Sequence, residues 1–144
     1  MDRILYSRKS DEWETPQNLF NDLHNEFNFT LDAAASDELH KCPKYYTASD
    51  DGLAQSWEHE RVFVNPPYSK IATWVKKCYM EHKKHGGLIV LLIPARTDTR
   101  YFHDYIYHKA EIRFIKGRLR FSNASENAPF PSIIVIFGGS AHEQ

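Results

Sequence analysis

The feature that most constrains the fold is an unbroken run of six aliphatic residues, LIVLLI, at positions 88–93. A strand that is apolar at every position is covered on both of its faces, as in a parallel sheet flanked by helices. The run is far shorter than the roughly 20 residues that a membrane-spanning helix needs. We therefore expect the centre of a sheet in an α/β protein at this place, and no segment that crosses a bilayer.

Apolar periodicity predicts two helices and two short strands before this run. Positions 71, 74, 75, 78 and 79 form the stripe of an amphipathic helix, which Gly86-Gly87 ends. Thr15-Pro16 is typical of a helix N-cap followed by the first helical residue, and the apolar spacing after it predicts a helix at 16–26. Short strands are expected at 29–31 and at 62–64, where the second must end because two prolines follow at 66 and 67.

The second half of the chain predicts an antiparallel ending to the sheet. A helix is expected at 99–108, strands at 111–115, 118–121 and 132–137, and a polar loop at 122–131. This order predicts an α/β fold in which ligands bind beyond the carboxyl ends of the parallel strands. Because no repeat or long linker interrupts the sequence, we expect a single domain over residues 1–144.

The two parts of the chain carry opposite charge. Residues 1–60 contain 13 Asp or Glu and 5 Lys or Arg, residues 61–144 contain 6 and 13, and the net charge is only −1. Either solvated side chains are grouped by chance, or an acidic part holds a ligand bearing hydroxyl or amino groups beside a basic part that faces a polyanion. Two cysteines make a disulfide framework implausible and the early charges argue against a signal peptide, so the expected location is the cytoplasm.

The tetrad NPPY at positions 65–68 follows the strand at 62–64 and carries the clearest chemistry. The Asn65 amide oxygen and the Pro66 carbonyl, stiffened by Pro67, can both accept hydrogen bonds from one planar amino group. Tyr68 offers a ring face against which a flat ring can stack. The tetrad therefore suits an NH2 group on a planar body, although a simple proline-rich turn remains an alternative.

Together with other segments, this tetrad resembles the small phage-type DNA adenine methyltransferases, the Dam family, among the class I amino-methyltransferases that use S-adenosylmethionine. The segments occur in the family's order: EWETP at 12–16, LDAAAS at 31–36, SDDGL at 49–53, NPPY at 65–68, PARTDTR at 94–100 and GRLRF at 117–121. The resemblance implies a compact Rossmann-like sheet, S-adenosylmethionine as cofactor and DNA as partner. It also implies methyl transfer to the exocyclic N6 of a flipped adenine.

The resemblance further implies roles for individual residues. The catalytic residues would be Asn65, Pro66, Pro67 and Tyr68, and the cofactor would contact Trp13, Thr15, Pro16, Asp32, Ala33, Ala34, Asp50 and Asp51. Physics allows these roles because carboxylates accept hydrogen bonds from ribose hydroxyls, an adenine amine or the methionine ammonium. Asp32 as a helix cap and Asp50-Asp51-Gly52 as a plain turn remain alternatives. A basic surface for DNA phosphates is expected from Arg96, Arg100, Arg113, Lys116, Arg118 and Arg120.

Two departures from the larger relatives limit the comparison. Only residues 37–49 separate the first cofactor loop from the acidic turn, so the ribose ligand is not assigned, and no insertion is long enough for a separate target-recognition domain. We expect relaxed sequence specificity for that reason. Cytosine N4 or protein glutamine methylation, and a non-catalytic DNA-binding module on the same fold, remain alternatives. No metal site is expected, since His40 and Cys42 lack a partner pair at zinc-site spacing; the oligomeric state stays open.

Overall fold

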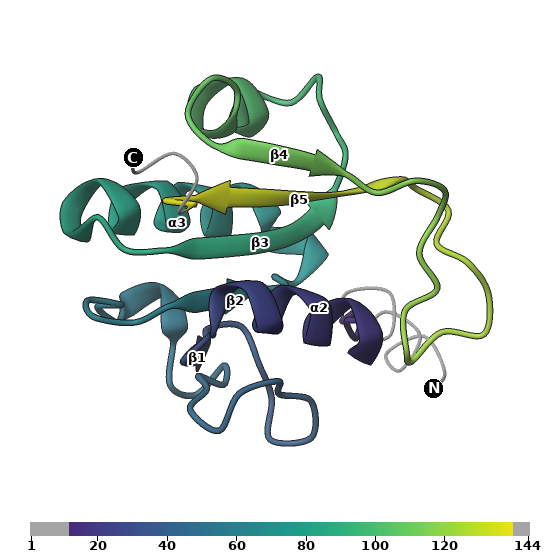
Figure 1. Cartoon of the computed structure of the whole chain (residues 1–144), viewed down its shortest axis with the longest axis horizontal. Helices are drawn as coiled ribbons and strands as arrows, with labels where there is room; N and C mark the ends of the chain where they lie inside the picture. The colour runs from purple at the N-terminus through teal and green to yellow at the C-terminus, as the bar shows by residue number, and fades with distance from the viewer. Residues whose placement is uncertain (1–11, 140–144) are drawn as a thin grey trace.

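The computed structural model describes residues 12–139 as a mixed α/β fold around one five-stranded sheet. The strands are β1 (Leu31–Asp32), β2 (Val62–Val64), β3 (Ile89–Pro94), β4 (Glu111–Phe114) and β5 (Ser132–Phe137). Their order across the sheet is β1-β2-β3-β5-β4 (Figure 1). The pairs β1·β2 and β2·β3 are parallel, whereas β5 runs antiparallel to both of its neighbours, β3 and β4. The prediction of an α/β sheet with an antiparallel ending is thereby confirmed.

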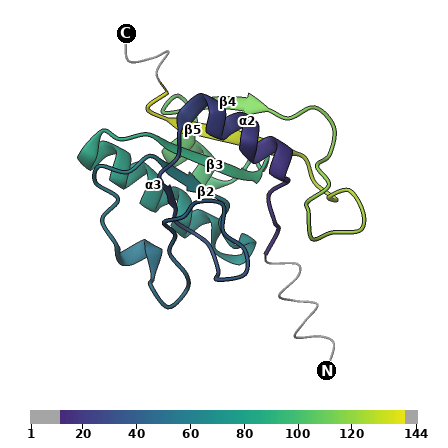
Figure 2. The same ribbon diagram turned by 60° about the horizontal axis from the view of Figure 1, so that its bottom comes forward.

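Two helices cover the opposite faces of the sheet (Figures 1 and 2). Helix α2 (Gln17–Phe27) packs Phe20, Leu23 and Phe27 into a core with Val90 and Leu92 of β3. Helix α3 (Ile71–His85) packs Trp74, Val75 and Cys78 into a second core with Ile89, Leu91 and Ile93 of the same strand. Every residue of β3 is buried because its alternate side chains enter the two cores. This is the burial that the aliphatic run at 88–93 predicts.

The helix ends follow ordinary capping chemistry. Helix α2 ends at Asn28, which adopts a left-handed conformation with φ 54°, and α3 ends at Gly86 with φ 73°. Asparagine and glycine are the residues that tolerate this conformation best. The N-cap position of α2 belongs to Pro16, so the prediction that Thr15 caps this helix is wrong. Within residues 12–139, no helix is long and apolar enough to cross a membrane.

Three further predictions on secondary structure need correction. The strand expected at 29–31 forms its ladder at Leu31–Asp32, and the helix expected at 99–108 is largely a five-residue π-helical segment, η3 (Phe102–Ile106). Residues 118–121 are not a strand. Phe121 is buried there because its ring packs edge-on against Trp13, 5.3 Å away between centroids, so the alternation in GRLRF reflects packing rather than a ladder.

Candidate active site

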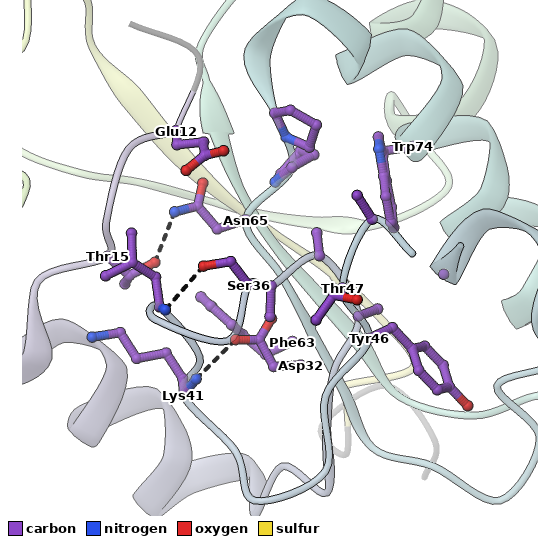
Figure 3. A pocket seen from close by; sticks show the side chains of 18 of the residues that line it. Glu12, Thr15, Asp32, Ser36, Lys41, Tyr46, Thr47, Phe63, Asn65 and Trp74 are labelled. Atoms are coloured by element: carbon purple, nitrogen blue, oxygen red, sulfur yellow. Dashed lines mark hydrogen bonds between the residues drawn. The ribbon is translucent and has the colours of Figure 1, made fainter. Parts of the chain in front are cut away.

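A cavity of about 350 Å³ lies at the carboxyl ends of β1 and β2 (Figure 3). Its size is within the range of small-molecule sites, roughly 300–1,000 Å³. Asp32, the last residue of β1, lines it with Ala33 and Ala34, and Asn65, Pro66 and Pro67 line it directly after β2. Because β1 and β2 are parallel neighbours, their carboxyl ends bring together two segments that are about thirty residues apart in sequence.

Asn65 is the best-defined polar group of the cavity. Its amide nitrogen donates to the Trp13 carbonyl and to Thr15 Oγ1, the latter at 2.9 Å. A carbonyl can only accept, so the amide NH2 must face Trp13 and the oxygen must face the other way. Asn65 Oδ1 is buried and has no hydrogen-bond partner within residues 12–139. Since a buried acceptor without a partner costs about 1–3 kcal/mol, this oxygen is poised to receive a donor from a ligand.

Segment 12–15 fixes this amide from the N-terminal side. The Thr15 hydroxyl, 2% exposed as a residue, is a partner of Asn65 rather than the cap of α2. The segment is itself held by the loop between β4 and β5, since Ser122 N donates to Glu14 O at 2.9 Å and Asn123 Oδ1 accepts from Glu14 N at 2.9 Å. Residues far apart in sequence therefore set the orientation of the tetrad.

Tyr68 does not line the cavity but lies beside it in an aromatic cluster. Its ring contacts Trp13 and Phe130, with centroid separations of 5.8 Å and 5.3 Å. The hydroxyl is buried without a partner within residues 12–139, and burial raises the pKa of Tyr68 well above its ordinary value, although nearby Arg96 opposes this. Tyr68 is therefore a neutral ring, and its contribution to the site is an apolar face.

Asp32 is the buried carboxyl of the cavity. Its side chain accepts hydrogen bonds from the backbone N–H groups of Lys41, at 2.9 Å, and of Ala34. Burial raises the pKa of Asp32 to about 6, and these backbone donors limit the rise. Asp32 holds together the loop that carries Lys41 and the end of β1, so the alternative that Asp32 caps a helix does not apply.

The cavity has a charged end and an apolar end (Figure 3). Glu12, Thr15 and Lys41 lie toward one side in the view, whereas Trp74 and Tyr46 lie toward the other. Lys41 Nζ is held by Gln17 Oε1 at 2.9 Å and lies 3.7 Å from Glu14 Oε2. A ligand with an amino-acid end and an aromatic end would match both parts of such a cavity.

The acidic turn divides into one residue inside the site and one outside. Asp51 lines the cavity, whereas Asp50 is exposed and turns its carboxylate back onto Thr47 N at 2.9 Å. Pro16 also lies outside the lining. Gly52 follows the turn in the 3₁₀ segment η1 (Gly52–Ala54), so close to Ala33 that an added Cβ would stand 2.4 Å from Ala33 O. The buried Trp57 fixes it there, because the indole N–H donates to Gly52 O at 3.0 Å.

The basic residues expected to meet DNA are separated by the structure. Arg96, Arg100, Lys116, Arg118 and Arg120 are exposed. The last three lie in the loop from β4 to β5, which projects past the end of the sheet on the side of segment 12–15 (Figure 1). Arg113 instead forms a bidentate pair with Glu26, both contacts at 2.7 Å, and also bonds Glu111 at 2.7 Å. These hydrogen bonds raise the pKa of Arg113, and its charge is neutralised within the protein.

Several lining residues were given no role of their own in the sequence interpretation. They are Glu12, Glu14, Ala35, Ser36, Leu39, Lys41, Tyr46, Thr47, Ala48, Gly52, Leu53, Phe63, Lys70 and Trp74. Some of them lie inside the motifs quoted above, namely Glu12, Glu14, Ala35, Ser36, Gly52 and Leu53, and most of the others lie a few residues from one, so proximity in sequence was the available signal. Trp74 had none, because its place in the helical stripe marks it only as core.

Comparison with known proteins identifies the family of the chain. The family model of DNA N-6-adenine-methyltransferase (Dam) matches residues 4–138. The chain belongs to this family. A DNA N-6-adenine-methyltransferase of Escherichia phage T1 is 35% identical over 111 residues, which are 76% of this chain and 46% of the relative.

A second Dam-family relative, the DNA N-6-adenine-methyltransferase of Haemophilus phage HP1, is 26% identical over 141 residues, or 91% of this chain and 82% of the relative. The chain thus spans about half the length of the T1 protein and most of the HP1 protein. In the chain that both relatives match, the NPPY tetrad directly follows the parallel strand β2, and its first three residues line the cavity.

Proposed function

We propose that this Dam-family protein transfers the methyl group of S-adenosylmethionine to the exocyclic N6 of an adenine in DNA. The observation that carries the proposal is the buried, unpartnered Asn65 Oδ1 beside a cavity of small-molecule size. An exocyclic amino group is a donor that this oxygen can accept. Family membership favours adenine in DNA over cytosine or a protein glutamine.

The reaction asks the protein mainly for positioning. When bound, S-adenosylmethionine would supply the methyl group from its positively charged sulfur and would leave as the neutral thioether. Asn65 Oδ1 and the Pro66 carbonyl accept hydrogen bonds from the two N–H groups of the amino group and orient the nitrogen lone pair toward the cavity. Once the amino nitrogen carried the methyl group, its extra proton would pass to water. Tyr68 supplies a face for the base, and Pro67 stiffens the turn.

The cavity residues fit the cofactor by chemistry. Carboxylates of Glu12, Asp32 and Asp51 suit the ammonium and the ribose hydroxyls, and the apolar end suits the adenine ring. The parallel strands β1, β2 and β3, with β5 reversed beside them, support a compact Rossmann-like class I methyltransferase sheet. Thr15 acts through Asn65, so we assign it a positioning role.

The target base must leave the DNA stack to reach this site, which costs a few kcal/mol. The exposed basic residues Arg96, Arg100, Lys116, Arg118 and Arg120 lie after β3 and in the loop joined to segment 12–15. Phosphate contacts from such residues would supply sequence-independent affinity and hold the duplex beside the tetrad. Arg113 is left out of this surface because its charge is already paired.

The test is incubation of the purified protein with DNA and S-adenosylmethionine labelled in the methyl group, followed by digestion of the DNA to nucleosides. We expect label in N6-methyladenine. Label in N4-methylcytosine or in protein would favour one of the alternative acceptors. Cofactor binding without transfer to any acceptor would leave a non-catalytic binding module and contradict the proposal.

A further inference from the structure

Helix α3 carries a buried charged residue to which the mechanism gives no role. Glu81 is 9% exposed, and among the buried residues of α3 it is the only one with a charge. Its Oε1 accepts a hydrogen bond from the backbone N–H of Trp57 at 2.7 Å, and its Oε2 accepts one from Lys77 Nζ at 3.0 Å. His85 Nε2 lies 3.7 Å from Oε1. Burial by itself raises the pKa of Glu81, but the Trp57 N–H and Lys77 outweigh it and bring the pKa below its ordinary value, so the carboxylate is ionised.

Lys77 and Glu81 hold the segment that follows η1 at two places. Lys77 Nζ donates to Gln55 O at 2.6 Å and lies 5.2 Å from the centre of the Trp57 ring. Glu81 binds the Trp57 N–H, as described above. A carbonyl and an N–H of the same short segment are thereby fixed to one side of the helix. We call Lys77 and Glu81 the α3 clamp.

The α3 clamp is connected to a wall of the cavity through Trp57. Its Nε1 donates to Gly52 O at 3.0 Å, and its ring stacks on that of Trp74, with 6.3 Å between centroids and 21° between planes. Gly52 and Trp74 both line the cavity and are neighbours, since a Cβ on Gly52 would stand 3.1 Å from the Trp74 ring. Trp74 lies at the apolar end of the cavity (Figure 3). This is the end proposed above for the adenine ring of the cofactor.

Helix α3 also begins next to the NPPY tetrad. Tyr68, the last residue of the tetrad, opens the 3₁₀ segment η2 (Tyr68–Lys70), and α3 starts at Ile71. The helix that follows the residues assigned to the amino group therefore also holds, farther along, the wall assigned to the cofactor. We propose that Glu81 is a positioning residue of the reaction, which keeps residues 52–57 against the cavity so that the cofactor meets a preformed wall. The inference rests on the function proposed above.

The expected size of the effect follows from the backbone N–H of Trp57. Glu81→Met removes its acceptor, and a buried donor left without a partner shifts the equilibrium from the held wall toward a released one by about 5-fold to 150-fold. The apparent affinity for the cofactor falls with the fraction of molecules whose wall is held. Glu81→Gln retains an acceptor oxygen for this N–H. Because bound cofactor itself holds the wall, the KM for the cofactor should rise while kcat is unchanged.

The experiment measures S-adenosylmethionine affinity by calorimetry, thermal stability without ligand, DNA affinity by fluorescence anisotropy, and kcat and KM. The variants are Glu81→Met, Glu81→Gln, Lys77→Met and, as the matched control for the last, Lys84→Met, which changes an exposed lysine of the same helix. We expect Glu81→Met to bind the cofactor at least about fivefold more weakly, with kcat and DNA affinity as in the wild type. Glu81→Gln should recover most of the loss. Lys77→Met should weaken cofactor binding, and Lys84→Met should not.

The outcomes separate the inference from the function on which it rests. Lower thermal stability of Glu81→Met with wild-type cofactor affinity would show that Glu81 only supports the fold, and would overturn the inference while N6-methyladenine is still formed. Equal losses of cofactor affinity in Glu81→Met and Glu81→Gln, or equal losses of kcat and cofactor affinity, would overturn it too. If Glu81→Met does not fold, equal cofactor affinity of Lys77→Met and Lys84→Met would overturn it. A wild type that binds no S-adenosylmethionine would overturn the proposed function and the inference together.

Discussion

Asp32 should make the stability of the free protein fall as pH rises from about 4 to about 6. Its pKa is about 6 in the folded protein, against an ordinary value of 3.8, because the carboxyl is 4% exposed and burial disfavours the charge. Below both values the carboxyl is protonated in both states and has no effect. Between them the folded state binds more protons than the unfolded state, so the free energy of unfolding decreases as pH rises. At 1.36 kcal/mol per pKa unit, the full effect is about 3 kcal/mol.

The assay compares the wild type with Asp32→Asn by urea denaturation at a series of pH values between 4 and 8. The difference between the two proteins cancels the other titrating groups. Asparagine keeps an acceptor for the Lys41 N–H but cannot ionise. We expect the variant to gain about 3 kcal/mol relative to the wild type as pH rises through this window. A difference that stays constant with pH would refute the reasoning.

The same carboxyl should make cofactor affinity depend on pH. If ionised Asp32 meets the methionine ammonium, about one in eleven molecules is in the binding-competent form at pH 5, so affinity at pH 5 should be about tenfold lower than at pH 8. Titration calorimetry of S-adenosylmethionine at the two pH values measures this. Asp32→Asn should remove the pH dependence of S-adenosylmethionine affinity. If the pH profile of the variant equals that of the wild type, the dependence arises from another group.

Three further outcomes follow from the geometry of the site. Tyr68→Phe should retain methylation within about threefold and gain up to about 1 kcal/mol of stability, because the lost hydroxyl is buried without a partner among the described residues; a tenfold loss of single-turnover rate would contradict this. Gly52→Ala should cost about 1–3 kcal/mol in denaturation and weaken S-adenosylmethionine in calorimetry, since the new methyl would meet Ala33 O at 2.4 Å. Arg118→Ala should lower DNA affinity and reduce the slope of log affinity against log salt concentration by about one. Arg113→Ala should lower stability at unchanged DNA affinity. Equal effects of the two substitutions on DNA affinity would disprove the assignment of Arg118, but not Arg113, to the DNA-binding surface.

The strands and helices could be predicted where burial and periodicity agree. The run at 88–93 is buried on both faces and forms β3, and the apolar stripe that begins at Ile71 is the buried face of α3, so both elements formed as expected. The alternation at Arg118–Phe121 failed as a signal, because Phe121 is buried by the ring of Trp13 from the other end of the chain. A period of two in four residues does not distinguish a ladder from such a contact.

The site was predictable only as far as its motifs. NPPY follows β2 and LDAAAS begins with β1, and these two strands pair in parallel, so the meeting of the two motifs at one edge follows from the fold. No local sequence pattern indicates that the Thr15 hydroxyl accepts a hydrogen bond from Asn65 instead of capping α2, or that Trp13 stacks with Tyr68. Both contacts depend on where segment 12–15 is held by the loop between β4 and β5, a tertiary arrangement. The pairing of Arg113 with Glu26 is of the same kind, since the two lie 87 residues apart.

The most direct test of the account is the single-turnover rate of N6-methyladenine formation by Asn65→Ala, measured beside its affinity for S-adenosylmethionine. Asn65 Oδ1 is the buried acceptor assigned to the amino group, and loss of one such polarising group typically costs about 10²–10³ in rate. We expect a loss of that size with cofactor affinity and fold retained. A rate within tenfold of the wild type in a folded, cofactor-binding Asn65→Ala protein would contradict the central claim.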